Sequence, residues 1–190
     1  MKLISSLILI VLILTSCKEE TLFIPKPATY LRPVLPKHTY IKYNDECPYT
    51  LSLPKIFKIK KISSEDGLTC HKDIELGPLN GIIHFSYIYM NEPLATYVNF
   101  TNNQIDNHKI KATNINDYTI INESSSVYCT FFELQGNVAS PFQFYITDSV
   151  SNFVRGVVYF NSTPNYDSLK PSLDYLKTDL KHMITNFKWK

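Results

Sequence analysis

The segment 142–160 contains two runs of strand-forming residues, Phe142-Gln-Phe-Tyr-Ile-Thr-Asp148 and Phe153-Val-Arg-Gly-Val-Val-Tyr-Phe160, joined by the short stretch Ser-Val-Ser-Asn at 149–152. Aromatic and β-branched side chains fit the pleated surface of a sheet. A connection of this length between two such runs is typical of a β-hairpin. The segment therefore predicts two antiparallel strands that form a hairpin.

Further short strands are expected on the N-terminal side of this hairpin. The clearest is GIIHFSYIY at 81–89, where Ile83, Phe85, Tyr87 and Tyr89 share one face. The stretch from Pro93 to about Lys111 instead predicts a middle helix, although Asn102 and Asn103 are poor helix formers. The other expected strands are 49–53, 56–62, 68–76, 118–121 and 127–134.

The C-terminal segment carries the clearest helical pattern. Its apolar residues recur at steps of three and four, which places them on one stripe of an amphipathic helix. Asp167 and Ser168 are candidate caps, and Pro171 is expected in the first turn, where a missing N–H is tolerated. Lys177 and Lys181 are expected on the exposed side. The stripe consists of Leu169, Leu173, Leu176, Leu180, Met183, Ile184 and Phe187.

These elements together predict an α+β fold. We expect a mainly antiparallel sheet, covered by the C-terminal amphipathic helix and by the middle helix, in an order loosely similar to PsbP-like sandwiches. The composition excludes a nucleic-acid partner, because the net charge is only +2 and the two arginines, Arg32 and Arg155, cannot form a cluster. The lysines at 55, 58, 60 and 61 are better explained as the solvated face of an edge strand.

The first sixteen residues have the pattern of a signal peptide. Their uninterrupted apolar run, 7–14, is too short for a membrane span, which needs about 20 residues. Leu14-Thr-Ser-Cys17 then matches the bacterial lipobox, in which the cysteine receives a lipid. Because two acyl chains such as palmitate make a stable anchor, we predict lipidation at Cys17 and the lipid bilayer as a partner.

Two alternatives to this lipoprotein interpretation remain. One is a cleaved signal peptide followed by an unrelated cysteine. The other is a secreted eukaryotic protein, because Asn99, Asn122 and Asn161 each begin a glycosylation triplet. Such triplets are expected by chance in a chain so rich in Asn, Ser and Thr, whereas the lipobox requires four ordered positions.

Three segments are therefore expected along the chain. Residues 1–16 are a lipoprotein signal peptide, and residues 17–38 are a lipidated N-terminus with a Pro-rich tether. Pro25, Pro27, Pro33 and Pro36 favour extended polyproline geometry in this tether. Residues 39–190 form a single α+β domain.

The remaining cysteines suggest one disulfide and one core residue. An oxidising envelope permits disulfides, and Cys47 and Cys70 flank two short strands at a plausible spacing. Cys129 shares a strand face with Val127 and Phe131, so it is expected to be a buried small hydrophobe. Zinc is disfavoured because paired C-x-x-C spacing is absent. No metal ion and no cofactor is predicted.

No pattern in the sequence predicts catalysis. Four histidines, at 38, 84, 108 and 182, are isolated, and the known hydrolase and phosphate-binding motifs do not occur. Asp148 is interpreted as a turn residue, and Asp174 and Asp179 as members of a solvated helix face. We therefore predict no catalytic residue.

Several longer strings carry a family resemblance. They are Pro25-Lys-Pro-Ala-Thr-Tyr-Leu-Arg32, Asp45-Glu-Cys-Pro-Tyr49, Ile83-His-Phe-Ser-Tyr87, His108-Lys-Ile-Lys-Ala112, Gly136-Asn-Val-Ala-Ser-Pro-Phe-Gln-Phe-Tyr-Ile-Thr-Asp-Ser149, Phe153-Val-Arg-Gly-Val-Val-Tyr-Phe-Asn161, Pro164-Asn-Tyr-Asp-Ser-Leu169 and Phe187-Lys-Trp-Lys190. In order and content they resemble the GldD-type gliding-motility lipoproteins of Bacteroidetes. The chain departs from that family at 99–107, where it is richer in Asn.

The resemblance implies a part in gliding motility, in bacteria that also carry type IX secretion, with envelope proteins of those systems as partners. It carries over no catalytic residue. Lys18-Glu-Glu20 also resembles the surface-export signal of Bacteroidetes lipoproteins, and we favour the outer membrane over the inner.

The expected protein is thus a non-catalytic interaction or structural component of the cell envelope. The alternative is an envelope ligand-binding lipoprotein or an enzyme of unknown substrate. A deep pocket with convergent polar groups favours the alternative, whereas a flat, partly apolar exposed patch favours interaction.

Overall fold

The computed structural model describes residues 33–64 and 67–190. The predicted signal peptide, Cys17 and the tether as far as residue 32 lie outside the described residues. Within the described part, no helix is long and apolar enough to cross a membrane.

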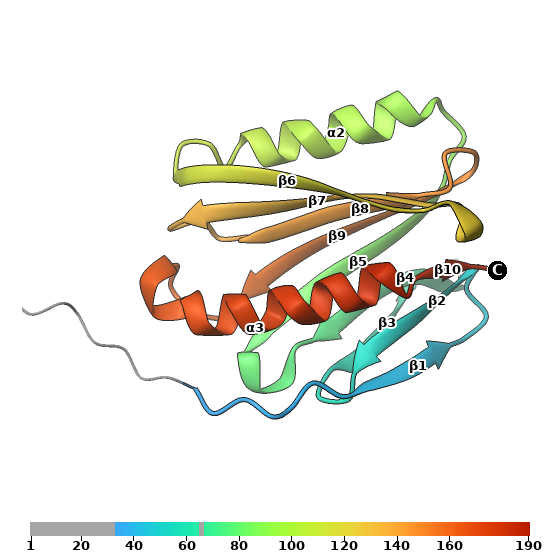
Figure 1. The fold of residues 1–190 in the computed structure, drawn as a ribbon. Coiled ribbons are helices and arrows are strands. Elements are labelled where there is room, and N and C mark those ends of the chain that lie inside the picture. The colour runs from blue at the N-terminus through green and yellow to red at the C-terminus, as the bar shows by residue number, and fades with distance from the viewer. Residues whose placement is uncertain (1–32, 65–66) are drawn as a thin grey trace, which may run out of the picture. The chain divides into compact units, whose positions relative to one another are not determined.

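Seven of the described strands form one antiparallel sheet in the order β3-β4-β5-β9-β8-β7-β6 (Figure 1). The predicted hairpin is confirmed as β8 and β9, and β9 lies between β8 and β5. The lysine-rich strand β3 lies at an edge of this sheet, as predicted. The strands are β3 (Lys58–Ser64), β4 (Gly67–Glu75), β5 (Gly81–Tyr89), β6 (Ala112–Asn122), β7 (Val127–Gly136), β8 (Phe142–Thr147) and β9 (Asn152–Phe160).

Three shorter strands form a second antiparallel sheet in the order β1-β2-β10. They are β1 (Tyr40–Asn44), β2 (Tyr49–Pro54) and β10 (Lys188–Trp189). Sequence patterns predicted β2 but neither β1 nor β10. Both flank β2, so their strand geometry depends on a partner that local periodicity does not reveal. Two single-turn 3-10 helices, η1 (Gly77–Leu79) and η2 (Glu123–Ser125), complete the connections.

The C-terminal helix α3 (Tyr166–Thr185) lies over one face of the seven-stranded sheet, which we call the inner face. Five residues of the predicted stripe, from Leu173 to Ile184, are buried on this helix, and Leu176 and Leu180 have no exposed surface. Leu169 is only half-buried, and Phe187 is buried but lies after the end of the helix. Gly156 on β9 is necessary here, since a Cβ at this position would overlap the Phe144 ring. Inner-face side chains packed in this core include Ile83, Phe85, Cys129, Phe131, Phe144, Val154 and Val158.

The start of α3 differs from the prediction. The helix begins at Tyr166 and is capped by Asn165, whose Oδ1 accepts from the Ser168 N–H at 3.2 Å. Asp167 and Ser168 are therefore in the first turn, and Pro171 falls in the second. Pro171 removes the hydrogen bond that the Asp167 carbonyl would accept. Asp167 is exposed, so water can replace that bond.

The middle helix α2 (Leu94–Asp106) covers the opposite, outer face of the sheet and ends before the predicted Lys111 (Figure 1). Residues 107–111 form tight turns instead, with bonds such as Lys111 N–H to the His108 carbonyl. Asn102 and Asn103 in the second half of α2 lower its helix propensity, which favours the earlier end. β6 then begins six residues before the predicted Tyr118, because this polar stretch pairs with β7. The predicted α+β class, a mainly antiparallel sheet with two covering helices, is confirmed.

Candidate functional site

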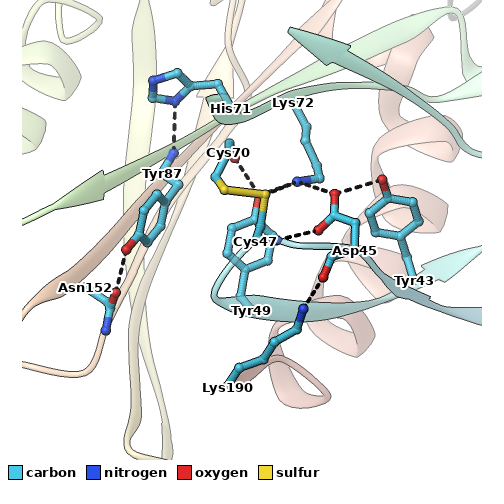
Figure 2. The surroundings of a disulfide bond; sticks show 10 residues. All are labelled: Tyr43, Asp45, Cys47, Tyr49, Cys70, His71, Lys72, Tyr87, Asn152 and Lys190. Atoms are coloured by element: carbon cyan, nitrogen blue, oxygen red, sulfur yellow. Dashed lines mark hydrogen bonds and ion pairs between the residues drawn. A yellow bond between two sulfur atoms is a disulfide. The ribbon is translucent and has the colours of Figure 1, made fainter. Parts of the chain in front are cut away.

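Cys47 and Cys70 form a disulfide in the structure, with their Cα atoms 5.5 Å apart (Figure 2). Cys47 precedes β2 and Cys70 belongs to β4, so the bond links the small sheet to the large one. The Tyr49 hydroxyl also donates to the Cys70 carbonyl at 2.6 Å. Cys129 is free and buried, as predicted for a core residue, and burial raises the pKa of its thiol.

Lys72 is buried beside this disulfide, a position that sequence reasoning missed. Its ammonium group lies 3.1 Å from Asp45 Oδ2 and donates to the Tyr49 hydroxyl at 2.8 Å and to Cys47 Sγ at 3.2 Å (Figure 2). Burial lowers the pKa of Lys72, and the Asp45 carboxylate opposes this effect. The available signal was the two-residue period of a strand, because Lys72 lies two positions before Ile74 and therefore on the same, core-facing side of β4.

Asp45 holds three segments together around Lys72. Its carboxylate accepts from the Cys47 backbone N–H at 3.1 Å and from the Tyr43 hydroxyl at 3.0 Å. Its backbone carbonyl accepts from Lys190 Nζ (Figure 2). Burial alone would raise the pKa of Asp45, but the Cys47 N–H, Lys72 and Tyr43 together lower it. The cluster joins the start of β2, strand β4 and the C-terminus, so its geometry is that of a structural junction.

Asp179 is fully buried, which corrects the prediction that it lies on a solvated helix face. Its Oδ1 accepts from His38 Nδ1 at 2.7 Å and from the Tyr40 hydroxyl at 3.0 Å. Burial and this hydrogen bond raise the pKa of Tyr40 to about 12. The missed signal was again positional, because 179 is three residues after Leu176 and lies on the apolar stripe.

The segment before β1 is held against α3 through this carboxylate and through aromatic stacking. The His38 ring stacks on Tyr175 with centroids 4.2 Å apart, and the Tyr175 hydroxyl donates to the Pro36 carbonyl at 2.9 Å. Lys177 was also expected to be exposed, but it is half-buried and lies 2.5 Å from Glu133 on β7. Asp174 and Lys181 are exposed, as predicted.

Ser52 and His182 lie close together, but they do not form a hydrolytic triad. The Ser52 hydroxyl is 2.9 Å from His182 Nε2, and the Tyr40 ring covers the imidazole at a centroid distance of 3.4 Å. A triad needs a carboxylate on Nδ1. The nearby carboxylate, Asp179, instead bonds His38 and Tyr40, and Nδ1 lies 3.4 Å from the Asn186 amide. Among residues 33–64 and 67–190, no group of three metal-ligating side chains converges.

A family model for the gliding motility lipoprotein GldD matches residues 20–189. The chain belongs to the GldD family. It is thus a gliding-motility lipoprotein, and this membership places it at a membrane of the cell envelope. The match extends over both sheets and both helices described above.

No curated protein matches the chain. Among solved structures, cyanobacterial PsbP (CyanoP) from Synechocystis sp. PCC 6803 is similar, with a TM-score of 0.45 and 8% sequence identity. That similarity covers 80% of this chain and 94% of the cyanobacterial one.

Proposed function

We propose that this chain is a membrane-anchored, non-catalytic interaction module of the gliding-motility apparatus that is associated with type IX secretion. The observation that carries this proposal is the family match over residues 20–189. The bilayer, through Cys17, and envelope proteins of motility or secretion are its partners. Residues 1–16 are the signal peptide, residues 17–38 the anchor and tether, and residues 39–190 the interaction domain, at the outer membrane in preference to the inner.

The described structure supports a binding scaffold over an enzyme. The buried Lys72 bonds Asp45 and the buried Asp179 bonds His38, so both groups stabilise junctions between segments. Meanwhile three large apolar side chains are exposed at the same end of the seven-stranded sheet. Tyr89 ends β5, Val150 lies in the β8–β9 turn, and Ile121 is near the end of β6. Tyr89 and Val150 are neighbours here, because Tyr89 pairs with Asn152 directly after the turn, and we expect a protein partner to contact these two side chains.

Photo-crosslinking in motile cells tests this function. A photoreactive amino acid at position 89 or 150 should capture a motility or secretion protein, identified by mass spectrometry. The matched control is position 58, an exposed site on the edge strand β3. Capture of the same proteins from position 58, or capture only of unrelated proteins from 89 and 150, would contradict the proposal.

One observation favours the alternative, an envelope ligand-binding lipoprotein or enzyme. An open groove of about 660 Å³ lies between residues 33–35 and the first half of α3, lined by Leu35, Lys170, Asp174 and Tyr175 among others. A thermal-shift screen of small metabolites decides between the two. A saturable shift that Tyr175→Arg abolishes would favour the alternative.

A further inference from the structure

Arg155 on β9 is a half-buried cation whose charge is not neutralised. It points to the outer face of the sheet, where Ser86 of β5 lies opposite it in register. Among the described residues, no carboxylate lies within 4 Å of its guanidinium. In contrast, the buried Lys72 has Asp45 and the half-buried Lys177 has Glu133. Charges that are partly removed from water normally have a partner of opposite sign.

Gln143 on β8 fixes the orientation of this guanidinium. Gln143 is fully buried, and its Oε1 accepts from Arg155 Nη2 at 3.0 Å. A guanidinium only donates hydrogen bonds, so the amide oxygen must face it and the amide nitrogen must point elsewhere. Gln143 Nε2 and Arg155 Nε are both buried and have no acceptor in the described structure. The pair therefore presents donors in excess, which suits an acidic ligand.

Arg155 is partly exposed on one side and lightly covered on the other. Its neighbour Ser86 on β5, but not Arg155 itself, lines a separate hollow of about 340 Å³ over β4 and β5 together with His71. His71 Nδ1 accepts from the Tyr87 N–H, so the proton of the neutral ring is on Nε2. On the covered side, the Phe100 ring of α2 lies 5.9 Å from the guanidinium carbon and is itself 57% exposed.

Helix α2 is held far less tightly than α3. Of its 13 residues only Thr101 and Ile105 are buried. Ile105 packs with Leu134 and Val138, and the Tyr97 ring lies 5.5 Å from the buried Phe153 ring. A helix with so few buried apolar contacts opens locally at low cost. Arg155 is partly exposed beside this helix, but its Nε is covered, so a ligand would reach Nε only when α2 shifts outward.

We propose that Arg155, positioned by Gln143, binds a carboxylate side chain of a protein partner at the edge of α2. The planar guanidinium matches the two oxygens of a carboxylate. A single arginine suits a monoanion better than a doubly charged phosphate group. The exposed Phe100 favours a protein ligand, because a peptide adds apolar contact beside its acid. The identity of the partner rests on the proposed function; the chemistry of the site does not.

Side-chain NMR of the full-length lipoprotein in detergent micelles tests the site. The chain has two arginines, so the Nε–Hε spectrum should contain an Arg155 signal and an Arg32 signal that serves as internal control. The probes are an N-acetylated, C-amidated Phe-Glu-Phe peptide, the matched capped Phe-Gln-Phe peptide, acetate and inorganic phosphate, so that the Glu side chain is the only carboxylate of either peptide. We expect the Glu peptide to shift the Arg155 signal saturably and acetate to shift it weakly. The Gln peptide should leave it unchanged. Arg155→Lys has no Nε–Hε group at this position, so its binding is followed through the backbone amide signal of Phe100. It should bind the Glu peptide at least about tenfold more weakly, since the bidentate, charge-assisted pair is lost.

Gln143→Glu is the decisive variant, because it places an internal carboxylate on Arg155 without removing any residue. It should fold, as judged by its thermal melting, and lose the Glu-peptide response. An unchanged response in Gln143→Glu or Arg155→Lys would overturn the proposal, as would a saturable phosphate shift equal to that of the peptide. Failure here is distinct from failure of the proposed function, which the cellular crosslinking measures independently of this peptide.

Discussion

At the scale of single residues, Lys72 carries the most concentrated set of polar contacts in the described core. Lys72→Met should reduce the free energy of unfolding by about 3 kcal/mol, because it leaves the Asp45 carboxylate without its cation. Urea denaturation measures the change. Lys60→Met on the exposed edge strand β3 is the matched control and should change stability by less than about 0.5 kcal/mol. Equal losses in both variants would show that the buried pair contributes nothing specific.

The same pair predicts a sensitivity to acid. The pKa of Asp45 is lowered in the folded protein from its ordinary value of 3.8. The stabilisation it provides is therefore complete above that value and is lost as pH falls through the lower, folded pKa. The free energy of unfolding of the wild type should decrease below about pH 4. In Asp45→Asn the free energy of unfolding should decrease less over the same pH range, because this carboxylate no longer takes up a proton.

The disulfide of Cys47 and Cys70 is a second prediction at the residue scale. Non-reducing peptide mapping of protein from the cell envelope should recover the two cysteines in one cross-linked peptide, with Cys129 as a free thiol. Over a sequence separation of 23, such a bond stabilises the fold by about 3 kcal/mol in the chain-entropy model. Recovery of both thiols in free form, or a linkage to Cys129, would contradict the pairing.

At the scale of elements, α3 is expected to be structural. Leu180→Ala removes a fully buried side chain from the stripe and should cost about 2–5 kcal/mol in chemical denaturation. Lys181→Ala, at the adjacent exposed position, should cost almost nothing. If Leu180→Ala keeps its stability but loses motility or partner capture, the stripe faces a partner and the helix is a binding site.

The contact between α3 and the segment before β1 gives a further prediction at this scale. His38→Ala should leave the buried Asp179 carboxylate with the Tyr40 hydroxyl as its remaining donor. Hydrogen exchange in β1 should accelerate, because the segment that leads into β1 is no longer held on the helix. His84→Ala, which removes an outer-face imidazole bonded to Asp73, is the control and should leave β1 unchanged. Equal protection of β1 in both variants would mean that pairing with β2 suffices.

At the scale of the whole molecule, the decisive residue is Cys17, which lies outside the described residues. Cys17→Ser should abolish incorporation of labelled palmitate and release the protein from membranes, because no acyl chain then anchors it. Metabolic labelling and fractionation measure both effects. A Cys17→Ser protein that still takes up label and stays in membranes would contradict the anchor assignment.

The sequence by itself determined the features that depend on local periodicity. The alternation in 142–160 predicted the β8–β9 hairpin, and the three- and four-residue steps predicted the buried stripe of α3. The ordered strings of the chain also pointed to the GldD family, which the family match confirms. The spacing of apolar residues is sufficient for these features, because the face on which a side chain lies follows from its position within its own helix or strand.

Only the tertiary structure decided how distant residues pair. His38 and Asp179 are 141 positions apart, and a charged residue within a stripe is interpreted as solvated until its partner is known. The same reason explains the burial of Lys72, the pairing of β1 and β10 with β2, and the absence of a carboxylate beside Arg155 among the described residues. Periodicity reports which way a side chain faces, whereas the free energy of burying a charge depends on which groups the fold brings to it.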